Sequence, residues 1–187
     1  MLPRPLSMLL FAALAVTTTL VASCRTARAT PAKQRVTRVL VRKGEHSMQL
    51  LAGDGKGKEE VVASYKIAIG PGGAGPKRRE GDMTTPVGRY HVTMHQPSQY
   101  KTFLRLDYPT AADHRRFAML KERGEIPKSA RIGGDIGIHG PPVALDGITK
   151  TALKAFDWTA GCIAVDEDEI SEIARLVPDG TIVDIED

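Results

Sequence analysis

Two residues in this chain have side chains and glycine neighbours suited to nucleophilic chemistry. Cys162 follows Gly161 in the segment TAGCIAV, and His139 precedes Gly140 in the segment IGIHG. An imidazole near a thiol favours the reactive thiolate and returns a proton to a leaving group. A glycine beside the nucleophile lets backbone N–H groups approach a developing oxyanion closely. The pair predicts catalysis by a cysteine; a packing cysteine and a strand-end histidine are the simpler alternative.

The segment after Cys162 suggests how the reactivity of its thiol would be raised. Residues 166–177, DEDEISEIARLV, have the periodicity of an amphipathic helix. The apolar face of this helix consists of Ile170, Ile173, Ala174 and Val177. A cysteine just upstream of a helix start lies in the positive potential of the helix dipole, which lowers its pKa. We therefore expect a lowered pKa for Cys162.

Residues 1–23 have the features of a secretory signal peptide. Arg4 provides an early positive charge, and an apolar run extends from Leu6 to Ala22. A retained N-terminal anchor helix is the alternative interpretation. The segment predicts that the protein leaves the cytoplasm.

The end of this segment is similar to the lipobox of bacterial lipoproteins. Val-Ala-Ser precedes Cys24, which predicts lipidation of this cysteine, and Ala27–Ala29 offers a competing site for ordinary signal peptidase. Arg25 after the cysteine favours the outer membrane, by resemblance to Gram-negative sorting rules. Lipidation would consume the thiol of Cys24, and cleavage by ordinary signal peptidase would remove the residue. In either case Cys162 is the only thiol of the mature chain, in a compartment that favours disulfides. It is then a buried hydrophobe, an intermolecular linker or a nucleophile.

The composition is that of one globular domain with no sign of a nucleic-acid partner. The chain has 187 residues, of which 42% are hydrophobic and 26% charged. The net charge is only +4 and aromatic residues make up 5%, so neither a basic groove nor a stacking surface is indicated. Short basic clusters such as Lys77-Arg78-Arg79 are interpreted as solvated surface.

Short apolar runs separated by turns dominate residues 36–187, which follow a polar tether at residues 24–35. Strands are expected at 36–42, 47–52, 60–69, 89–94, 136–139 and 181–186. Helices are expected at 110–124 and 166–177, with a short helix or a loop at 145–156. The segment 96–131 is otherwise irregular. The pattern predicts a mainly β domain, a sandwich or barrel, with one or two short helices.

Two further motifs suggest ligand sites but carry little weight. His91 and His95 have helical metal-ligand spacing, yet they lie in a strand-like segment, where their side chains would be about 13 Å apart. The glycine-rich loop at residues 70–81 has Pro76 where a phosphate-binding loop needs lysine. We expect no metal and no organic cofactor.

The combination of motifs resembles the YkuD-type L,D-transpeptidase family. The family signature places a histidine-glycine before a Ser/Thr-x-Gly-Cys segment, here Thr159 to Cys162, and a Thr-Pro-x-Gly-x-Tyr turn upstream, here residues 85–90. The resemblance extends from about Val36 to Ile185 and implies an L,D-transpeptidase-type β-sandwich or barrel. Gly-Cys-Ile-Ala-Val is similar to the YafK-like and ErfK-like members.

The resemblance implies a cysteine acyltransferase of peptidoglycan, with no cofactor. Cys162 would attack the carbonyl of the third stem residue, usually meso-diaminopimelate, and release D-alanine. His139 would activate the thiol, oriented by the Gly140 carbonyl, and the N–H groups of Gly161 and Cys162 would bind the oxyanion. The acyl group would pass to an amine of another stem or of a wall-attached protein. The setting would be the periplasm or cell envelope, with the protein lipid-anchored.

Other features leave substrate choice open. Trp158 and Thr159 would line the donor groove or simply pack, and residues 96–131 would form a rim over the cleft or a surface excursion. Ala160 and Ala164 stand where the family often has histidine and arginine, which removes two polar contacts. A hydrolase acting on the same bonds (an L,D-carboxypeptidase or amidase) and a non-catalytic wall-binding lipoprotein are the alternatives. A papain-like or NlpC-type peptidase is disfavoured, because there the cysteine precedes the histidine.

Overall fold

The computed structural model describes residues 35–53 and 57–187. The predicted signal peptide at residues 1–23, the lipidation site Cys24 and almost all of the tether lie outside the described residues. The strands are β1 (Val36–Arg42), β2 (Ser47–Gly53), β3 (Glu59–Lys66), β4 (Gly88–Ser98), β5 (Lys101–Leu106), β6 (Gly137–His139), β7 (Ile163–Ala164) and β8 (Ile182–Glu186). The helices are α1 (Ala111–Glu122), α2 (Gly147–Ala152), α3 (Glu167–Leu176) and a short 3₁₀ turn, Leu153–Ala155. None of the helices in the described ranges has the length and hydrophobicity needed to span a membrane.

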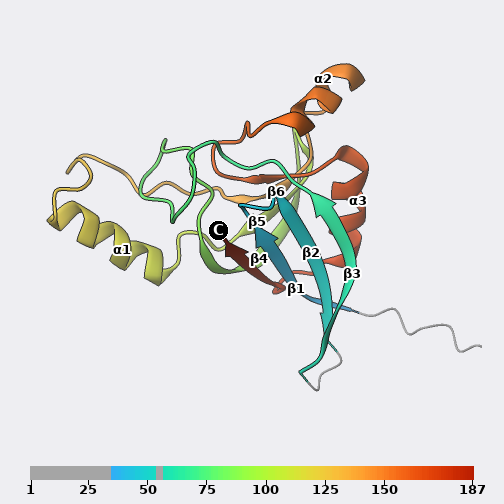
Figure 1. Ribbon diagram of the computed structural model, residues 1–187, viewed down its shortest axis with the longest axis horizontal. Coiled ribbons are helices and arrows are strands. Elements are labelled where there is room, and N and C mark those ends of the chain that lie inside the picture. Colours follow the sequence, from blue (N-terminus) through green and yellow to red (C-terminus); the bar gives the residue numbers. More distant parts are fainter. Residues whose placement is uncertain (1–34, 54–56) are drawn as a thin grey trace, which may run out of the picture. The chain divides into compact units, whose positions relative to one another are not determined.

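The strands of the described chain form one curled eight-stranded sheet with the order β3-β2-β1-β8-β4-β5-β6-β7 (Figure 1). The two ends of this order meet just after β3. There the N–H of Ala68 donates to the Ala164 carbonyl at 2.9 Å, and the Ala164 N–H returns a bond of 2.8 Å to Ala68. The predicted mainly β fold is confirmed, and the bridge gives it the barrel form, because a sheet whose ends pair has no open edge at that point.

Apolar side chains that alternate along the strands fill the inside of the curled sheet, and α3 covers this core. Ile170, Ile173 and Val177 are fully buried, as the helix pattern predicts, and Ala174 packs against them in part. Each fully buried isoleucine contributes about 1.5–3 kcal/mol. The Tyr65 hydroxyl of β3 donates to Glu172 at 3.2 Å, which ties the helix to the sheet.

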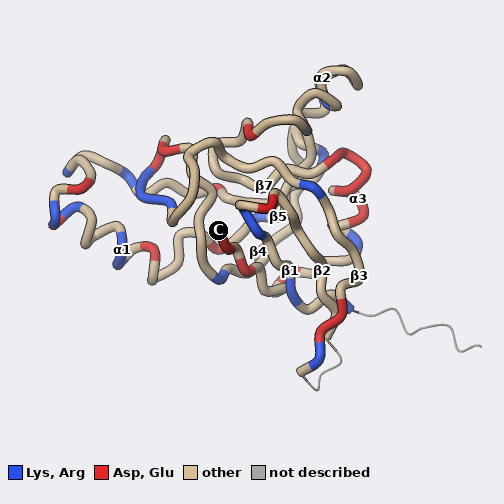
Figure 2. The backbone as a smooth tube through the Cα atoms, viewed as in Figure 1, with Lys and Arg blue, Asp and Glu red and all other residues tan. Residues whose placement is uncertain are grey.

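Local capping explains where the helices begin. Thr110 and Asp113 form a capping box at the start of α1, and Gly124 ends its last turn with a φ of +68°. Acidic residues fill the first turn of α3, where the helix dipole favours them (Figure 2). The expected short helix or loop at 145–156 is a helix, α2, so the described chain has three α-helices, one more than the pattern indicated.

The segment 96–106 differs from the irregular structure expected of it. Residues 88–98 form one long strand, and the chain turns back at Lys101, which has a φ of +72°, into β5. The strand β5 then pairs with both β4 and β6. Phe103 and Leu104 are both buried, on opposite faces of β5, so the period-2 pattern of a half-exposed strand is absent. The hairpin is part of the sheet and not a surface excursion.

Candidate active site

The parallel pairing of β6 and β7 places the two candidate catalytic side chains together. His139 is in register with Ala164, and Ile138 with Ile163. Paired residues of adjacent strands face the same side, and side chains two apart on a strand do too. Cys162, two residues before Ala164, is therefore on the face of His139. Both line an open cleft of about 510 Å³.

The walls of the cleft come from four parts of the chain. The β4–β5 hairpin provides one wall, and the loop before β6 together with β6 provides a second. The segment 158–162 provides the third wall, and Met83 lies at the margin of the cleft. The lining residues are Met83, Gln96, Ser98, Gln99, Tyr100, Phe103, Arg105, Asp135, His139, Trp158, Thr159, Ala160 and Cys162. Part of the segment 96–131, residues 96–105, thus lines the cleft, whereas α1 contributes no lining residue.

The imidazole of His139 is held in one orientation. Its Nδ1 lies 2.7 Å from the Gly140 carbonyl, so this nitrogen carries the proton and donates it, and Nε2 is the basic nitrogen of the neutral ring. The side chain is 3% exposed. Its neighbours are Tyr100 at 4.2 Å between ring centroids, Phe103 at 5.9 Å and the edge of Trp158 at 5.6 Å. Burial lowers the pKa of His139, against the opposing effect of the Gly140 carbonyl.

The thiol of Cys162 is free and protonated at neutral pH. Its Sγ donates to the Asp135 carbonyl at 3.4 Å. Burial raises the pKa of Cys162, and the Gly137 N–H and the Lys77 ammonium offset only part of that effect. The lowered pKa expected from the helix start is therefore wrong. Residues 163–165 separate Cys162 from Asp166, the N-cap of α3, so the thiol is not part of the first helical turn, where the helix dipole is strongest.

The turn before Cys162 is fixed by two threonines. The Thr159 hydroxyl donates to the Cys162 carbonyl at 2.8 Å and accepts the Gly161 N–H at 3.2 Å. The buried hydroxyl of Thr85, which accepts the Gly70 N–H, lies 3.4 Å from the same carbonyl. Gly161 adopts a φ of +125°, and a Cβ there would lie 2.8 Å from the Thr84 carbonyl oxygen. The Gly161 N–H, one of the two expected oxyanion donors, is thus already engaged with Thr159.

Lys77 lies behind this turn and is not part of a solvated cluster. Its side chain is 3% exposed, and its Nζ bonds Asp82 at 2.6 Å and the Thr84 carbonyl at 3.4 Å. Asp82 also accepts the backbone N–H groups of Arg78, Arg79 and Thr84. The loop after β3 is folded around this ion pair, with Nζ 3.5 Å from the position of a Cβ at Gly161. Sequence patterns missed Lys77 because a buried and an exposed lysine look alike in a basic cluster.

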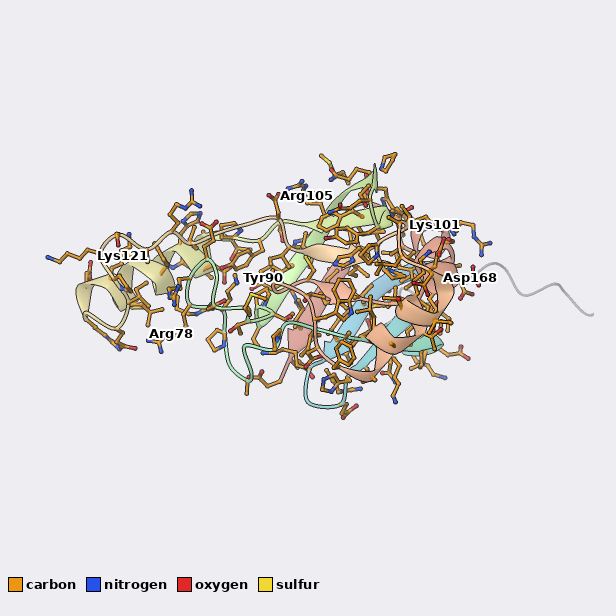
Figure 3. All side chains as sticks on the ribbon, turned by 90° about the horizontal axis from the view of Figure 1, so that it is seen from above. Arg78, Tyr90, Lys101, Arg105, Lys121 and Asp168 are labelled. Atoms are coloured by element: carbon orange, nitrogen blue, oxygen red, sulfur yellow. The ribbon has the colours of Figure 1, made fainter. Side chains whose placement is uncertain are left out.

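A charged pair occupies another wall of the cleft. Arg105 on β5 forms an ion pair with Asp135, and its guanidinium lies 5.8 Å from the Phe103 ring centroid. Asp135 has a φ of +55°, unusual for a residue other than glycine, and its side chain is 79% exposed. Figure 3 shows Arg105 at the outer margin of the ribbons, whereas Tyr90 lies among them. Neither Arg105 nor Asp135 belongs to a sequence motif, so sequence analysis did not identify this pair.

Trp158 separates the cleft from a second hollow. This smaller space of about 250 Å³ lies between α2 and the start of α3, and Trp158 lines both. Trp158 thus touches open space on two sides, in addition to its edge contact with His139.

The other histidines singled out by their spacing have separate partners. His91 contacts Asp107 at 3.1 Å, and His95 contacts Asp179 at 2.6 Å, both from β4. Among the described residues, no group of three or more His, Cys, Asp or Glu side chains could hold a metal ion.

Comparison with known proteins gives one family. A model of the YkuD domain, the L,D-transpeptidase catalytic domain, matches residues 36–185. The protein named putative L,D-transpeptidase YafK of Escherichia coli K12 is 39% identical over 57 residues, 29% of this chain and 23% of that protein. The structure is similar to that of Pgp2 from Campylobacter jejuni, with a TM-score of 0.61 and 27% identity over 81% of this chain and 48% of Pgp2.

A second solved structure supports the fold at lower identity. Bd1075 of Bdellovibrio bacteriovorus has a TM-score of 0.55 and 19% identity, and the similarity covers 81% of this chain and 48% of that one. The chain therefore spans about half the length of these two solved structures, and matches under a quarter of the curated relative.

Proposed function

Because this chain belongs to the YkuD family of L,D-transpeptidase catalytic domains, we propose that it transfers acyl groups of peptidoglycan stem peptides through a thioester on Cys162. One observation carries the proposal: Cys162 and His139 lie on the same face of two paired strands and line one open cleft. A thiol and an imidazole sharing a cleft are what acyl transfer through a thioester needs most.

The first step begins from two uncharged side chains. The Nε2 of His139 takes the proton of the Cys162 thiol as Sγ attacks the carbonyl carbon of the third stem residue, meso-diaminopimelate in this proposal. Nδ1 keeps its bond to the Gly140 carbonyl, which holds the ring while it gains charge. The tetrahedral oxyanion would bind the Cys162 N–H, and the Gly161 N–H once it leaves the Thr159 hydroxyl.

Collapse of that intermediate breaks the bond to D-alanine. The imidazolium of His139 gives its proton to the departing amine, and a thioester on Cys162 remains. An amine acceptor then attacks the thioester, Nε2 takes the proton of that amine, and the thiol leaves by regaining the proton. With an amine from another stem the product is a cross-link, and with an amine of a wall-attached protein it is a tether.

The biological setting is inferred from the relatives. Pgp2 of C. jejuni is a helical cell shape determining protein, and by that likeness we infer that this chain acts on the wall and affects cell shape. A wall substrate places the protein in the cell envelope, in agreement with the expected signal peptide and lipid at Cys24. The similarity covers only about half of Pgp2, so activity, substrate and partner all belong to the proposal.

Hydrolysis of the same thioester is the second candidate function, favoured by one observation. Ala160 lines the cleft beside the nucleophile, and Ala164 is buried next to it in β7. Neither side chain can bind a polar acceptor, which leaves water as the competing attacker. The protein would then be an L,D-carboxypeptidase or an amidase.

The test is to incubate the purified protein with a tetrapeptide muropeptide and to record the intact mass of the protein and the released products. We expect an adduct on Cys162 with loss of D-alanine, and at least about a 1,000-fold loss of turnover in Cys162→Ala. Added amine acceptors separate the two candidates, because transfer consumes the acceptor and hydrolysis does not. A folded protein that forms neither adduct nor product would be the non-catalytic wall-binding alternative, and the proposal would be wrong.

A further inference from the structure

We propose that Arg105 and Asp135 form a subsite for a zwitterionic amino-acid group, one carbon that bears both an ammonium and a carboxylate. This inference rests on the proposed function, in which the free end of the diaminopimelate side chain is such a group. Arg105 would bind the carboxylate and Asp135 the ammonium. The pair would thus select the donor that Cys162 attacks.

The sheet directs Arg105 into the cleft of Cys162, and Asp135, in the loop just before β6, lines the same cleft. Phe103 and Arg105 are two residues apart on β5 and share a face, whereas Leu104 between them is fully buried in the core. Arg105 is in register with Gly137 of β6, two residues after Asp135. The two charges therefore meet across neighbouring strands, on the face of Phe103 and His139.

The backbone of Asp135 is in direct contact with the nucleophile. The Asp135 carbonyl accepts the Cys162 thiol at 3.4 Å, so the subsite begins at the residue next to Sγ. A donor whose reacting carbonyl is at Sγ would extend its side chain past Asp135 toward the guanidinium. Phe103, against which that guanidinium lies, also stacks on His139, so the subsite and the base share one wall.

The charges in the cleft are specific to this pair. Among the described residues that line it, Arg105 and Asp135 alone carry a full charge, since His139 is held neutral. The others are apolar or neutral, including Gln96, Ser98 and Gln99. One cation beside one anion complements a zwitterion and neither a simple anion nor a simple cation.

A purely structural role explains this pair poorly. An exposed ion pair contributes little to stability, because water screens it and ordering the side chains costs entropy. Asp135 also holds a left-handed backbone conformation that, among residues with a Cβ, Asp and Asn adopt most readily. An uncommon backbone conformation beside a nucleophile points to a role in the site.

The experiment compares three tetrapeptide donors that differ only at the third residue: meso-diaminopimelate, its side-chain carboxamide, and L-lysine, which lacks the carboxylate. In the unchanged protein we expect kcat/KM for the first donor to exceed that for the other two by about 10-fold or more. In Arg105→Gln this preference should disappear, mainly through a higher KM for the meso-diaminopimelate donor.

The second arm tests the ammonium. Acetylation of the side-chain amine should weaken the donor in the unchanged protein and make no difference in Asp135→Asn, since asparagine tolerates the same backbone conformation. Arg131→Gln is the matched control, an exposed arginine paired with Glu80 outside the cleft, and should keep every preference.

The outcomes separate the two proposals. If no donor acylates Cys162 in the unchanged protein, the proposed function fails. If donors react and Arg105→Gln keeps the preference for meso-diaminopimelate, or slows all donors equally, the subsite proposal alone is overturned.

Discussion

Burial acts on the two reacting side chains in opposite directions. It raises the pKa of the Cys162 thiol and lowers the pKa of the His139 imidazole, because water solvates the charged form of each better than the protein does. Both groups are therefore uncharged in the resting site. The proton must move as Sγ attacks, so the orientation of Nε2 by the Gly140 carbonyl matters more than a preformed ion pair would.

Lys77 is the cation that offsets the burial of Cys162, and its removal should be measurable at the thiol. We expect Lys77→Met to raise the pKa of Cys162 further, since a positive charge that favours the thiolate is lost. The rate of alkylation by iodoacetamide at pH 8 should fall about threefold to tenfold. The pH at which this rate rises should be higher than in the unchanged protein.

Two variants control for a damaged loop in that measurement. Lys77→Arg keeps the charge and should keep most of the alkylation rate. Lys121→Met removes a lysine of α1, a helix that contributes no residue to the cleft, and should have no effect. An unchanged alkylation profile in folded Lys77→Met would show that the ammonium does not act on the thiol.

At this scale the sequence indicated the two candidate catalytic residues, which the structure brings to one cleft, but not their environment. Cys162 and His139 were found from residue type, glycine neighbours and export. The roles of Lys77 and Asp135 were not, and Thr85 was noted only as part of the family turn, because these contacts depend on loops that meet only in the fold. The Thr85 hydroxyl, for example, reaches the Cys162 carbonyl across a long stretch of sequence. The direction of the thiol pKa was also wrong, since burial cannot be read from a single segment.

Among the elements, the turn from Thr159 to Cys162 constrains the site most tightly. Gly161 passes between the Thr84 carbonyl and Ile136, where a Cβ would lie 2.8 Å and 3.3 Å from these groups. Its φ of +125° excludes ordinary L-residues as well. A glycine is thus needed at position 161 because the turn packs closely against Thr84 and Ile136. This requirement is separate from the proposed role of its N–H group in binding the oxyanion.

We expect Gly161→Ala to lower the free energy of unfolding by about 1–3 kcal/mol and to reduce turnover more than stability alone explains. The backbone must shift to relieve the contact with Thr84, and that shift moves Cys162. Urea unfolding and muropeptide turnover measure the two effects. Gly147→Ala, in open space at the start of α2, is the control and should be neutral or slightly stabilising. Equal stability of the two variants would contradict the packing argument.

The helices and the regular strands were predictable, and the β4–β5 hairpin was not. Thr110, Gly124 and the spacing from Ile170 to Val177 indicate helices correctly because capping and periodicity are local signals. The strand β5 is buried on both faces, by the core at Leu104 and by the cleft wall at Phe103, so its sequence does not alternate. The wall that holds Arg105 was therefore beyond a pattern-based prediction.

For the whole molecule, β8 joins the two parts of the sheet, and Asp184 strengthens the joint. This strand pairs in parallel with β1 and antiparallel with β4. The Asp184 carboxylate accepts Arg89 of β4 at 2.7 Å and 3.0 Å, and Arg38 of β1 at 3.2 Å. These guanidinium groups, Arg89 first, hold the pKa of Asp184 below its ordinary value.

We expect Asp184→Asn to lower the free energy of unfolding by about 1 kcal/mol at neutral pH, a modest value because Arg89 is largely exposed. A carboxyl with a depressed folded pKa adds stability above its unfolded pKa, and that stability is lost as pH falls through the folded value. The difference from the unchanged protein should therefore shrink below about pH 4. Urea unfolding at pH 7 and pH 3 measures it.

The control for this prediction is Asp168→Asn, an exposed aspartate in the first turn of α3. It should change stability by only a few tenths of a kcal/mol, through the helix dipole. A pH-independent difference for Asp184→Asn would mean that the carboxylate charge is not what joins the strands.

The mainly β class followed from many short apolar runs separated by turns. The order of the strands did not, because nothing local says that residues 182–186 insert between β1 and β4 or that Ala68 meets Ala164. Such pairings are decided by which arrangement buries the most apolar surface, and that is a property of the whole chain.

The central position of β8 constrains the order in which the parts of the sheet can form. A chain made from its N-terminus has β1 and β4 ready long before the strand that joins them, and each waits with one edge unpaired. Pairing of residues 182–186 joins the two halves of the sheet, whose far ends meet at Ala68 and Ala164. A folding chain in which these residues have not yet paired therefore carries the Cys162 thiol but not the closed sheet around it.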